Sequence, residues 1–193
     1  MQPKAAFMRL SEERKQELIE KAKDLYLSHP YEKITARMLL SAMEINSATF
    51  YRYFNSKDDL FIYIYKLVSK KADSQTDYDK VYTETRRLSS ILDERDAKFA
   101  KLLYTVPEAI IHRIFFDDEE NLSLYKKVVQ TEKEAGLIPE DADIDLLAWM
   151  NMTGRYNAIL YYRRTHDSFD DDNINRFINY ISMDLLKHGY YKR

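Results

Sequence analysis

Apolar residues recur at three- and four-residue spacing along most of the chain, and no alternating strand pattern persists. Between Ser11 and Pro30, for example, Leu18, Ala22 and Leu25 form one apolar stripe of a helix. Ser11 is a favourable N-cap for this helix, and Pro30 stops its continuation. The pattern predicts an all-α protein.

The segment 34–54 predicts two short helices joined by a tight turn, which is a helix-turn-helix. Thr35 is a good N-cap, and Leu39 and Met43 follow at helical spacing, which gives a first helix of about two turns. After Ile45 in the turn, Asn46 or Ser47 can cap a second helix of similar length.

The second short helix should bury one face. Phe50 and Phe54 lie four residues apart and therefore share a side of the helix, while Ala48, Thr49 and Arg52 point elsewhere. We expect a small core of Phe50 and Phe54 with four leucines from the neighbouring helices: Leu18, Leu25, Leu39 and Leu60.

A longer helix should begin after Ser56-Lys57-Asp58-Asp59, which has the spacing of a capping box. Its apolar residues Leu60, Ile64 and Leu67 continue as far as Lys71, where a polar run begins at residues 72–80. We place a domain boundary there, with one domain at residues 1–71 and a second at 72–193.

The second domain also reads as helical. Helices are expected near residues 76–94, 97–116, 120–135, 143–166 and 172–188. Pro107 should kink or divide the second of these, and Gly136 with Pro139 should end the third. Asp143 can cap the fourth helix.

Composition and charge add modest constraints. The chain is 45% hydrophobic and 32% charged, and no apolar run approaches the roughly 18–20 residues of a membrane helix, so a soluble protein is expected. The absence of cysteines fits a cytoplasmic one. Residues 1–71 hold 13 Lys and Arg against 9 Asp and Glu, a balance of +4, whereas residues 72–193 have a balance of −6. A basic module on an acidic body suits nucleic-acid binding, although ordinary scatter also produces such a difference.

Catalytic and metal chemistry find little support in the sequence. There are no cysteines, and the four histidines lack partners at metal-ligand spacing. The acidic runs 117–120 and 170–172 fit helix starts better than cation sites. We therefore expect no enzyme, cofactor or metal; a small helical enzyme and a helical protein-interaction module remain the alternative functions.

The segment Thr49-Phe50-Tyr51-Arg52-Tyr53-Phe54, followed by Ser56-Lys57-Asp58-Asp59-Leu60, resembles the N-terminal domain of the tetracycline-repressor (TetR) family of bacterial regulators. Thr35 and Ile45 match the same pattern. Where that family usually has a small residue and then Gly in the turn, this chain has Met43-Glu44. The turn then needs altered packing or a non-glycine residue with positive φ.

The resemblance implies a transcriptional regulator that reads a pseudo-palindromic double-stranded DNA operator. Phosphate contacts are implied for Tyr51, Tyr53 and Lys57, although the two tyrosines could instead pack against Phe54. Side chains that can approach base edges are those of Arg37, Ser47, Ala48 and Thr49, and Arg52 completes the predicted DNA surface. Lys4 and Arg9 lie in a tail that could reach the DNA backbone, but a frayed, solvated terminus is expected.

The resemblance also implies a C-terminal domain that binds a small-molecule effector and forms a homodimer. The protein would then be a repressor that leaves its operator when the effector binds. Dimerisation is expected through the helices near 143–166 and 172–188. Candidate pocket residues, each of which could equally be ordinary core, are Tyr82, Phe99, Leu103, Tyr104, Ile110, His112 and Phe115.

Overall fold

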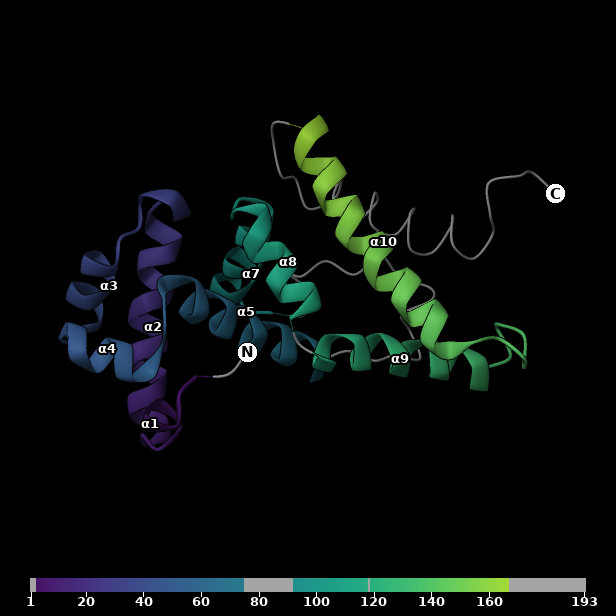
Figure 1. Cartoon of the computed structure of the whole chain (residues 1–193), viewed down its shortest axis with the longest axis horizontal. Helices are drawn as coiled ribbons and strands as arrows, with labels where there is room; N and C mark the ends of the chain where they lie inside the picture. The colour runs from purple at the N-terminus through teal and green to yellow at the C-terminus, as the bar shows by residue number, and fades with distance from the viewer. Residues whose placement is uncertain (1–2, 75–91, 118, 167–193) are drawn as a thin grey trace. The chain divides into compact units, whose positions relative to one another are not determined.

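The structure, a computed structural model, describes residues 3–74, 92–117 and 119–166 (Figure 1). The regular elements of these residues are all helical, as the sequence predicts. They are α1 (Ala5–Met8), α2 (Glu12–Ser28), η1 (Tyr31–Lys33), α3 (Ala36–Met43), α4 (Ser47–Tyr53), α5 (Lys57–Ser74), α7 (Glu94–Lys101), η3 (Leu102–Tyr104), α8 (Glu108–Phe116), α9 (Glu119–Glu134) and α10 (Ile144–Thr165).

The chain divides into two compact units. The described part of the first unit comprises residues 3–74 and 92–110, and that of the second comprises 111–117 and 119–166. The first unit thus contains the helix-turn-helix segment together with α7, η3 and the first residues of α8. The sequence-based boundary at residue 71 separates α7 from this segment, and it stays a prediction.

The predicted N-caps form in the structure. The side chains of Ser11, Thr35 and Asn46 accept hydrogen bonds from the main-chain N–H three residues later, at the starts of α2, α3 and α4. Ser56 does the same for Asp59 N at 3.1 Å, in the first turn of α5. These caps satisfy N–H groups that have no partner inside a helix, and they fix where each helix begins.

The predicted core of the helix-turn-helix is also confirmed, with one exception. Phe50, Phe54, Leu39, Leu60 and Leu18 are all 2% exposed or less, and the Phe50 and Phe54 ring centroids lie 6.0 Å apart. Leu25 is only half-buried. Phe99 of α7 enters the same unit, with its ring 5.2 Å from that of Phe61 in α5 and 6.1 Å from that of Tyr26 in α2.

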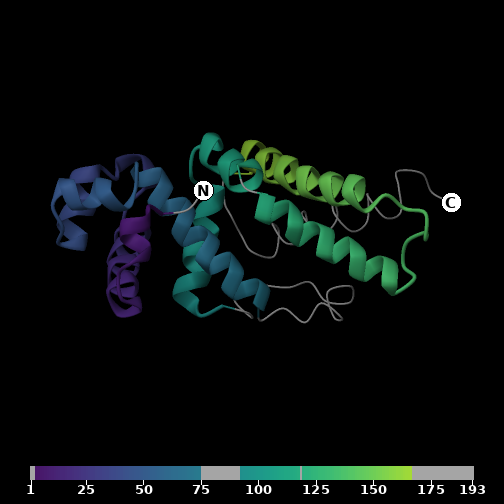
Figure 2. The same cartoon turned by 60° about the horizontal axis from the view of Figure 1, so that its bottom comes forward.

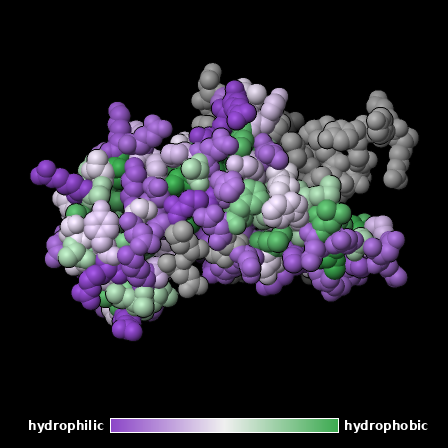
Figure 3. All heavy atoms as spheres, in the orientation of Figure 1, coloured by the Kyte–Doolittle hydropathy of each residue, from purple (hydrophilic) through white to green (hydrophobic). Residues whose placement is uncertain are grey.

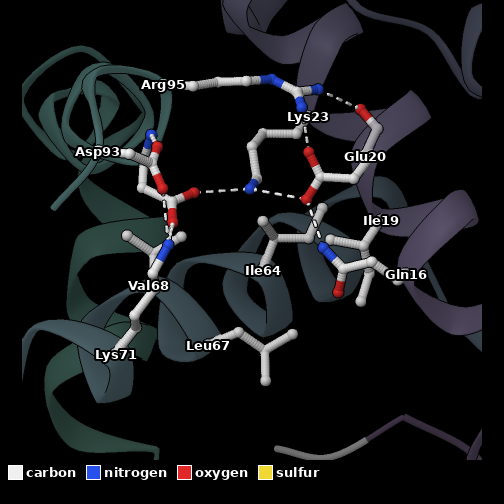
Figure 4. Close-up of a pocket in the computed structure, with 11 residues that line it drawn as sticks. Gln16, Ile19, Glu20, Lys23, Ile64, Leu67, Val68, Lys71, Asp93 and Arg95 are labelled. Atoms are coloured by element: carbon white, nitrogen blue, oxygen red, sulfur yellow. Dashed lines mark hydrogen bonds and ion pairs between the residues drawn. The ribbon is translucent and has the colours of Figure 1, made fainter. Parts of the chain in front are cut away.

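Charged residues join α7 to α2 and α5 beside this aromatic core, around a cavity of about 380 Å³ (Figure 4). Lys23 of α2 and Asp96 of α7 are each only 5% exposed, and their Nζ and Oδ1 atoms lie 2.6 Å apart. Lys71 of α5 contacts both Asp96 and Asp93 at 2.6 Å. The buried Asp96 therefore has two cationic partners, which offsets the loss of its hydration.

Arg95 extends the same network toward the surface. Its guanidinium donates to the carboxylate and the main-chain oxygen of Glu20, and to Asp24 Oδ1 at 2.5 Å. Glu20 in turn accepts from Lys23 at 3.0 Å. We call the seven residues of this cluster the α2–α5–α7 ion-pair network: Glu20, Lys23, Asp24, Lys71, Asp93, Arg95 and Asp96.

The second unit contains the remainder of α8 together with α9 and α10. Figure 2 shows α9 and α10 in two shades of green alongside each other, and Lys126 of α9 pairs with Asp145 of α10 at 2.8 Å. Ala148, Met152 and Ile159 form a buried side of α10. On α8 and α10, the rings of Phe115, Phe116 and Tyr156 form an aromatic cluster, with centroids 5.1–6.2 Å apart.

The predicted helix limits in this part of the chain agree closely with the structure. Pro107 separates η3 from α8, so the helix expected at 97–116 is divided there. Asp143 caps α10 by accepting from Leu146 N at 3.0 Å, and Gly136 after α9 has a φ of 69°. The expected helices at 76–94 and 172–188 lie largely or wholly outside the described residues, as does Tyr82. No described helix is both long and apolar enough to cross a bilayer.

The ion-pair network predicts an acid-sensitive contribution to stability. The hydrogen bond from Lys71 lowers the pKa of Asp93 from 3.8 to about 2, and the main-chain N–H of Asp96 acts in the same direction. A carboxyl group whose pKa is lower in the folded protein stabilises it above the unfolded value. This contribution is complete above about pH 4 and is lost as the pH falls toward 2.

Replacing Lys71 with Met should therefore lower the free energy of unfolding near pH 6 by about 1 kcal/mol, because Lys71 and Asp93 are partly exposed and the buried Asp96 keeps its ion pair with Lys23. The difference from the wild type should shrink between pH 4 and pH 2. Urea unfolding of both proteins across this range measures it, with Lys127→Met at an exposed position of α9 as a control for the lost charge. A difference that stays constant with pH would contradict the assignment.

Candidate nucleic-acid interface

The turn between α3 and α4 is built on Glu44. Its φ of 54° and ψ of 43° are left-handed, and it is the one non-glycine residue with positive φ in the part of the chain that the structure describes. Its N–H bonds to Ser41 O at 3.2 Å, and Ile45 N bonds to Leu40 O at 3.1 Å, which ends α3. The sequence left altered packing or a positive φ open at this position, and the structure has the positive φ.

The Glu44 side chain is tied to α2. Its carboxylate lies 2.9 Å from Lys21 Nζ, and Glu17 lies 3.0 Å from the same nitrogen. Hydrogen bonds to Glu44 and then to Glu17 raise the pKa of Lys21. An unfavourable backbone conformation at Glu44 is thus accompanied by an ion pair that glycine could not form.

The predicted base-reading side chains lie on an exposed edge of α3 and α4. Arg37 at the start of α3 is exposed, as are Ser47 and Ala48 in the first turn of α4, while Thr49 is half-buried. Purple and pale residues predominate over this region in Figure 3, with small green areas between them. The buried Phe50 holds α4 from the opposite side.

Tyr51, Arg52 and Tyr53 occupy the C-terminal half of α4. Tyr51 is 48% exposed and touches Phe50 by a ring edge, and Arg52 is exposed as well. Tyr53 is half-buried, with its ring 5.6 Å from that of Phe7. Of the two tyrosines, Tyr53 is therefore partly engaged in packing, whereas Tyr51 presents about half its surface to solvent.

Lys57 is held by the protein itself. Its ammonium donates to Ile34 O at 2.8 Å and to Tyr31 O at 3.1 Å, and it lies 4.6 Å from the centre of the Tyr31 ring. An ammonium has three donors, so a phosphate contact would use the third one or displace one of these bonds. Lys57 fixes the segment before α3 to the first turn of α5.

Two tyrosines reinforce the junction at Lys57. Tyr26 of α2 is fully buried and donates to Lys57 O at 2.7 Å, and Tyr31 donates to the carboxylate of Asp58. Burial, and secondarily the charge of Asp58, raises the pKa of the Tyr26 hydroxyl. The start of α5 is therefore bonded to α2 and to η1 within the first unit.

The N-terminal tail differs from the expected frayed terminus. Residues 5–8 form α1, and Phe7 is 0% exposed, with ring centroids 4.9 Å from Phe54 and 5.6 Å from Tyr63. Lys4 bonds to the main chain of α4. The sequence gives little sign of this packing, because the partners of Phe7 lie more than 40 residues away.

The candidate effector residues fall into two groups. Phe99, Leu103, Tyr104 and Ile110 are buried in the first unit, and the contacts of Phe99 with Tyr26 and Phe61 assign it to the core there. In the second unit, His112 and Phe115 both contact the ring of Tyr156. His112 and Phe115 therefore meet at the ring of Tyr156, and the predicted lining stays a prediction.

Metal-binding side chains do not gather within residues 3–74, 92–117 and 119–166: no three of His, Cys, Asp and Glu are placed to hold an ion. The acidic residues 119 and 120 occupy the first turn of α9. There they oppose the helix dipole, which agrees with the interpretation of this acidic run as a helix start.

Taken together, the capped helix pair α3–α4 and its exposed polar edge define a helix-turn-helix protein with an all-helical body. Residues 18–64 match the family model described as bacterial regulatory proteins, tetR family. Residues 18–64 thus carry the N-terminal domain of the TetR family of transcriptional regulators. No curated protein matches the chain.

Several solved structures share the fold over nearly the whole chain. The fatty acid degradation regulator FadR from Bacillus halodurans is 18% identical, with 96% of this chain and 100% of that one covered and a TM-score of 0.58. A TetR-family protein from Mesorhizobium loti is 18% identical (90% and 95% covered, TM-score 0.53). The regulator tylp from Streptomyces fradiae is 15% identical (90% and 86% covered, TM-score 0.51). At these identities the likeness shows the fold alone.

The left-handed conformation at Glu44 gives a test of the turn. Left-handed backbone costs an L-residue about 1–2 kcal/mol, and glycine avoids most of that cost. Glu44→Gly should therefore be about 1 kcal/mol more stable than Glu44→Gln, since both variants lose the ion pair with Lys21 but only Gly relieves the backbone. Chemical denaturation of the two variants measures this difference. Equal stabilities would mean that Glu44 is unstrained in solution.

Proposed function

We propose that the chain is a cytoplasmic repressor that binds a pseudo-palindromic DNA operator as a homodimer and is released by a small molecule. The observation that carries the DNA-binding part is the exposed edge of α3 and α4, which rests on a buried aromatic core. A short helix held in this way can enter the major groove with its N-terminal residues toward the bases.

The proposed DNA contacts divide by position along the helix-turn-helix. Arg37, Ser47, Ala48 and Thr49 approach base edges, and the exposure of the first three supports this role. Tyr51, Tyr53 and Lys57 contact phosphates, and Arg52 lies on the same surface. The hydrogen bonds that hold Lys57 also place its ammonium at the junction of η1 and α5.

Dimerisation is proposed through a second face of α10. Leu146, Met150 and Tyr161 are 41–56% exposed and follow helical spacing along one side, with Thr153, Gly154 and Asn157 between them. The opposite side buries Ala148, Met152 and Ile159. An exposed apolar stripe on α10 suits contact with a second copy, and small residues at its centre allow two helices to approach closely.

The proposed switch acts through α5 and α7. The helix α5 begins at Lys57, beside the helix-turn-helix, and carries Lys71 of the ion-pair network near its other end. Through Lys23 and Arg95 the network also fastens α7 to α2. A displacement of α7 would therefore also displace α2 and α5. In a dimer, a shift of about an ångström or two between the two α4 helices spoils their match to the two half-sites of the operator and weakens binding.

DNA binding is tested with the sequences that the wild-type chain selects from a random duplex pool. Arg37→Ala should change the selected bases, because a guanidinium in the major groove discriminates between base pairs. Lys57→Ala should weaken binding to all sequences and reduce the log–log salt slope by about 1.

The matched control for Lys57→Ala is Lys98→Ala, which removes the same charge from an exposed position on α7. Thermal unfolding of both variants separates loss of a phosphate contact from loss of the bonds to Ile34 and Tyr31. Failure of the wild-type chain to enrich any duplex sequence would refute the proposed function.

The dimer is tested by placing a charge on the exposed face of α10. Met150→Glu should convert a dimer to a monomer, because it inserts a carboxylate that would be desolvated without a partner at the interface. Sedimentation equilibrium measures the molar mass, and Gln130→Glu on an exposed position of α9 is the control. A dimer that persists unchanged in Met150→Glu would exclude this face.

The release step is tested by calorimetry with a compound that raises the melting temperature of the chain in a screen. Selected DNA should weaken binding of the compound by the same factor by which the compound weakens DNA binding, about 5–150-fold. Lys23→Met, which breaks the network, should reduce this factor. Equal affinity for the compound with and without DNA would refute the release step, and the chain would then be a constitutive DNA-binding protein.

A further inference from the structure

The C-terminal end of α4 is capped from outside the helix-turn-helix. The last carbonyl groups of a helix have no partner within it, and in α4 these include Tyr51 O and Tyr53 O. Lys4 supplies both missing donors: its main-chain N–H bonds to Tyr53 O at 2.9 Å and its ammonium bonds to Tyr51 O at 2.7 Å. Lys4 of the N-terminal segment therefore provides hydrogen-bond donors for two of the last carbonyl groups of α4.

The position of Lys4 is fixed by the helix that follows it. Lys4 is the residue before α1, and Phe7 of α1 is fully buried against Phe54 and Tyr53. Phe54 directly follows α4 in extended backbone, with a φ of −134°. The same short segment thus packs against the residue that ends α4 and donates to the carbonyls before it.

The charge of Lys4 suits this place. The C-terminal end of a helix carries partial negative charge, so a cation there is favourable. In a helix of only seven residues the end effects extend over much of its length, and the C-cap residue Phe54 supplies one donor, its N–H to Phe50 O at 2.9 Å.

We propose that Lys4 is a positioning residue for DNA reading, which acts by holding the last turn of α4 rather than by touching DNA. The segment from Pro3 to Leu10 then belongs to the DNA-reading apparatus, although the family match begins only at residue 18. The effect on DNA rests on the proposed function, whereas the effect on α4 itself does not.

The experiment compares Lys4→Met, Lys4→Arg and Arg9→Met. Lys4→Met keeps the length of the side chain but removes its charge and its donors, while Lys4→Arg retains both. Arg9→Met removes the same charge from an exposed residue of the same segment. Since Lys4 and Arg9 are both exposed, all three variants are expected to fold.

The first measurement is amide hydrogen exchange of residues 47–54 in the free chain. Lys4→Met should speed exchange of these amides roughly threefold to tenfold, as expected for the loss of a hydrogen bond from a charged donor at a partly exposed site. Lys4→Arg should restore most of the protection, and Arg9→Met should leave it unchanged. Unchanged exchange in Lys4→Met would overturn the proposal, whatever happens to DNA binding.

The second measurement is affinity for the duplex that the wild-type chain selects, at several salt concentrations. Lys4→Met should weaken binding to the selected sequence about threefold to tenfold while leaving the salt slope the same. A slope lower by about 1 would instead assign Lys4 to a phosphate contact and overturn the positioning role. If the wild-type chain selects no duplex, the proposed function fails, and the exchange data alone decide whether Lys4 holds α4.

Discussion

The helix α4 depends on the rest of the first unit for its shape. It has seven residues, and a helix of that length is unstable alone in water because few hydrogen bonds repay the cost of its first turn. Asn46 caps its start, Phe50 and Phe54 anchor one side, and Lys4 bonds to its last carbonyls. Phe54 packs against Phe7 of α1 and Tyr63 of α5, and Lys4 comes from the segment before α1, so α4 keeps its shape only while α1 and α5 are assembled around it.

The α2–α5–α7 ion-pair network extends this dependence beyond the helix-turn-helix. An isolated buried charge would be very costly, and Lys23 and Asp96 are tolerated because each has oppositely charged partners close by. Such a cluster specifies geometry more than it adds stability, since moving α7 away would leave Asp96 unpaired. The aromatic contacts of Phe99 would tolerate sliding far better than these bonds do.

Local features of the fold could be predicted from sequence, and long-range ones could not. Ser11, Thr35, Asn46 and Asp143 were found as caps because a cap is defined by the three residues that follow it. Lys57 illustrates the limit: its motif identified the start of α5, but its bonds to Tyr31 and Ile34 depend on how two helices meet. The role of Phe7 and the pairing of Lys23 with Asp96 join residues 46 or more positions apart, and no periodicity reports such contacts.

The placement of the basic residues explains why net charge is a weak guide to the DNA surface of this chain. Several of the cations in residues 1–71 are used internally: Lys15 pairs with Glu12, and Lys23 and Lys71 lie in the network. They add to the balance of +4 but are already committed to neighbours. Arg37 and Arg52, in contrast, are exposed on the helices of the proposed interface. The proposed DNA surface therefore rests on the location of a few charges on α3 and α4, because much of the positive charge in residues 1–71 serves packing within the first unit.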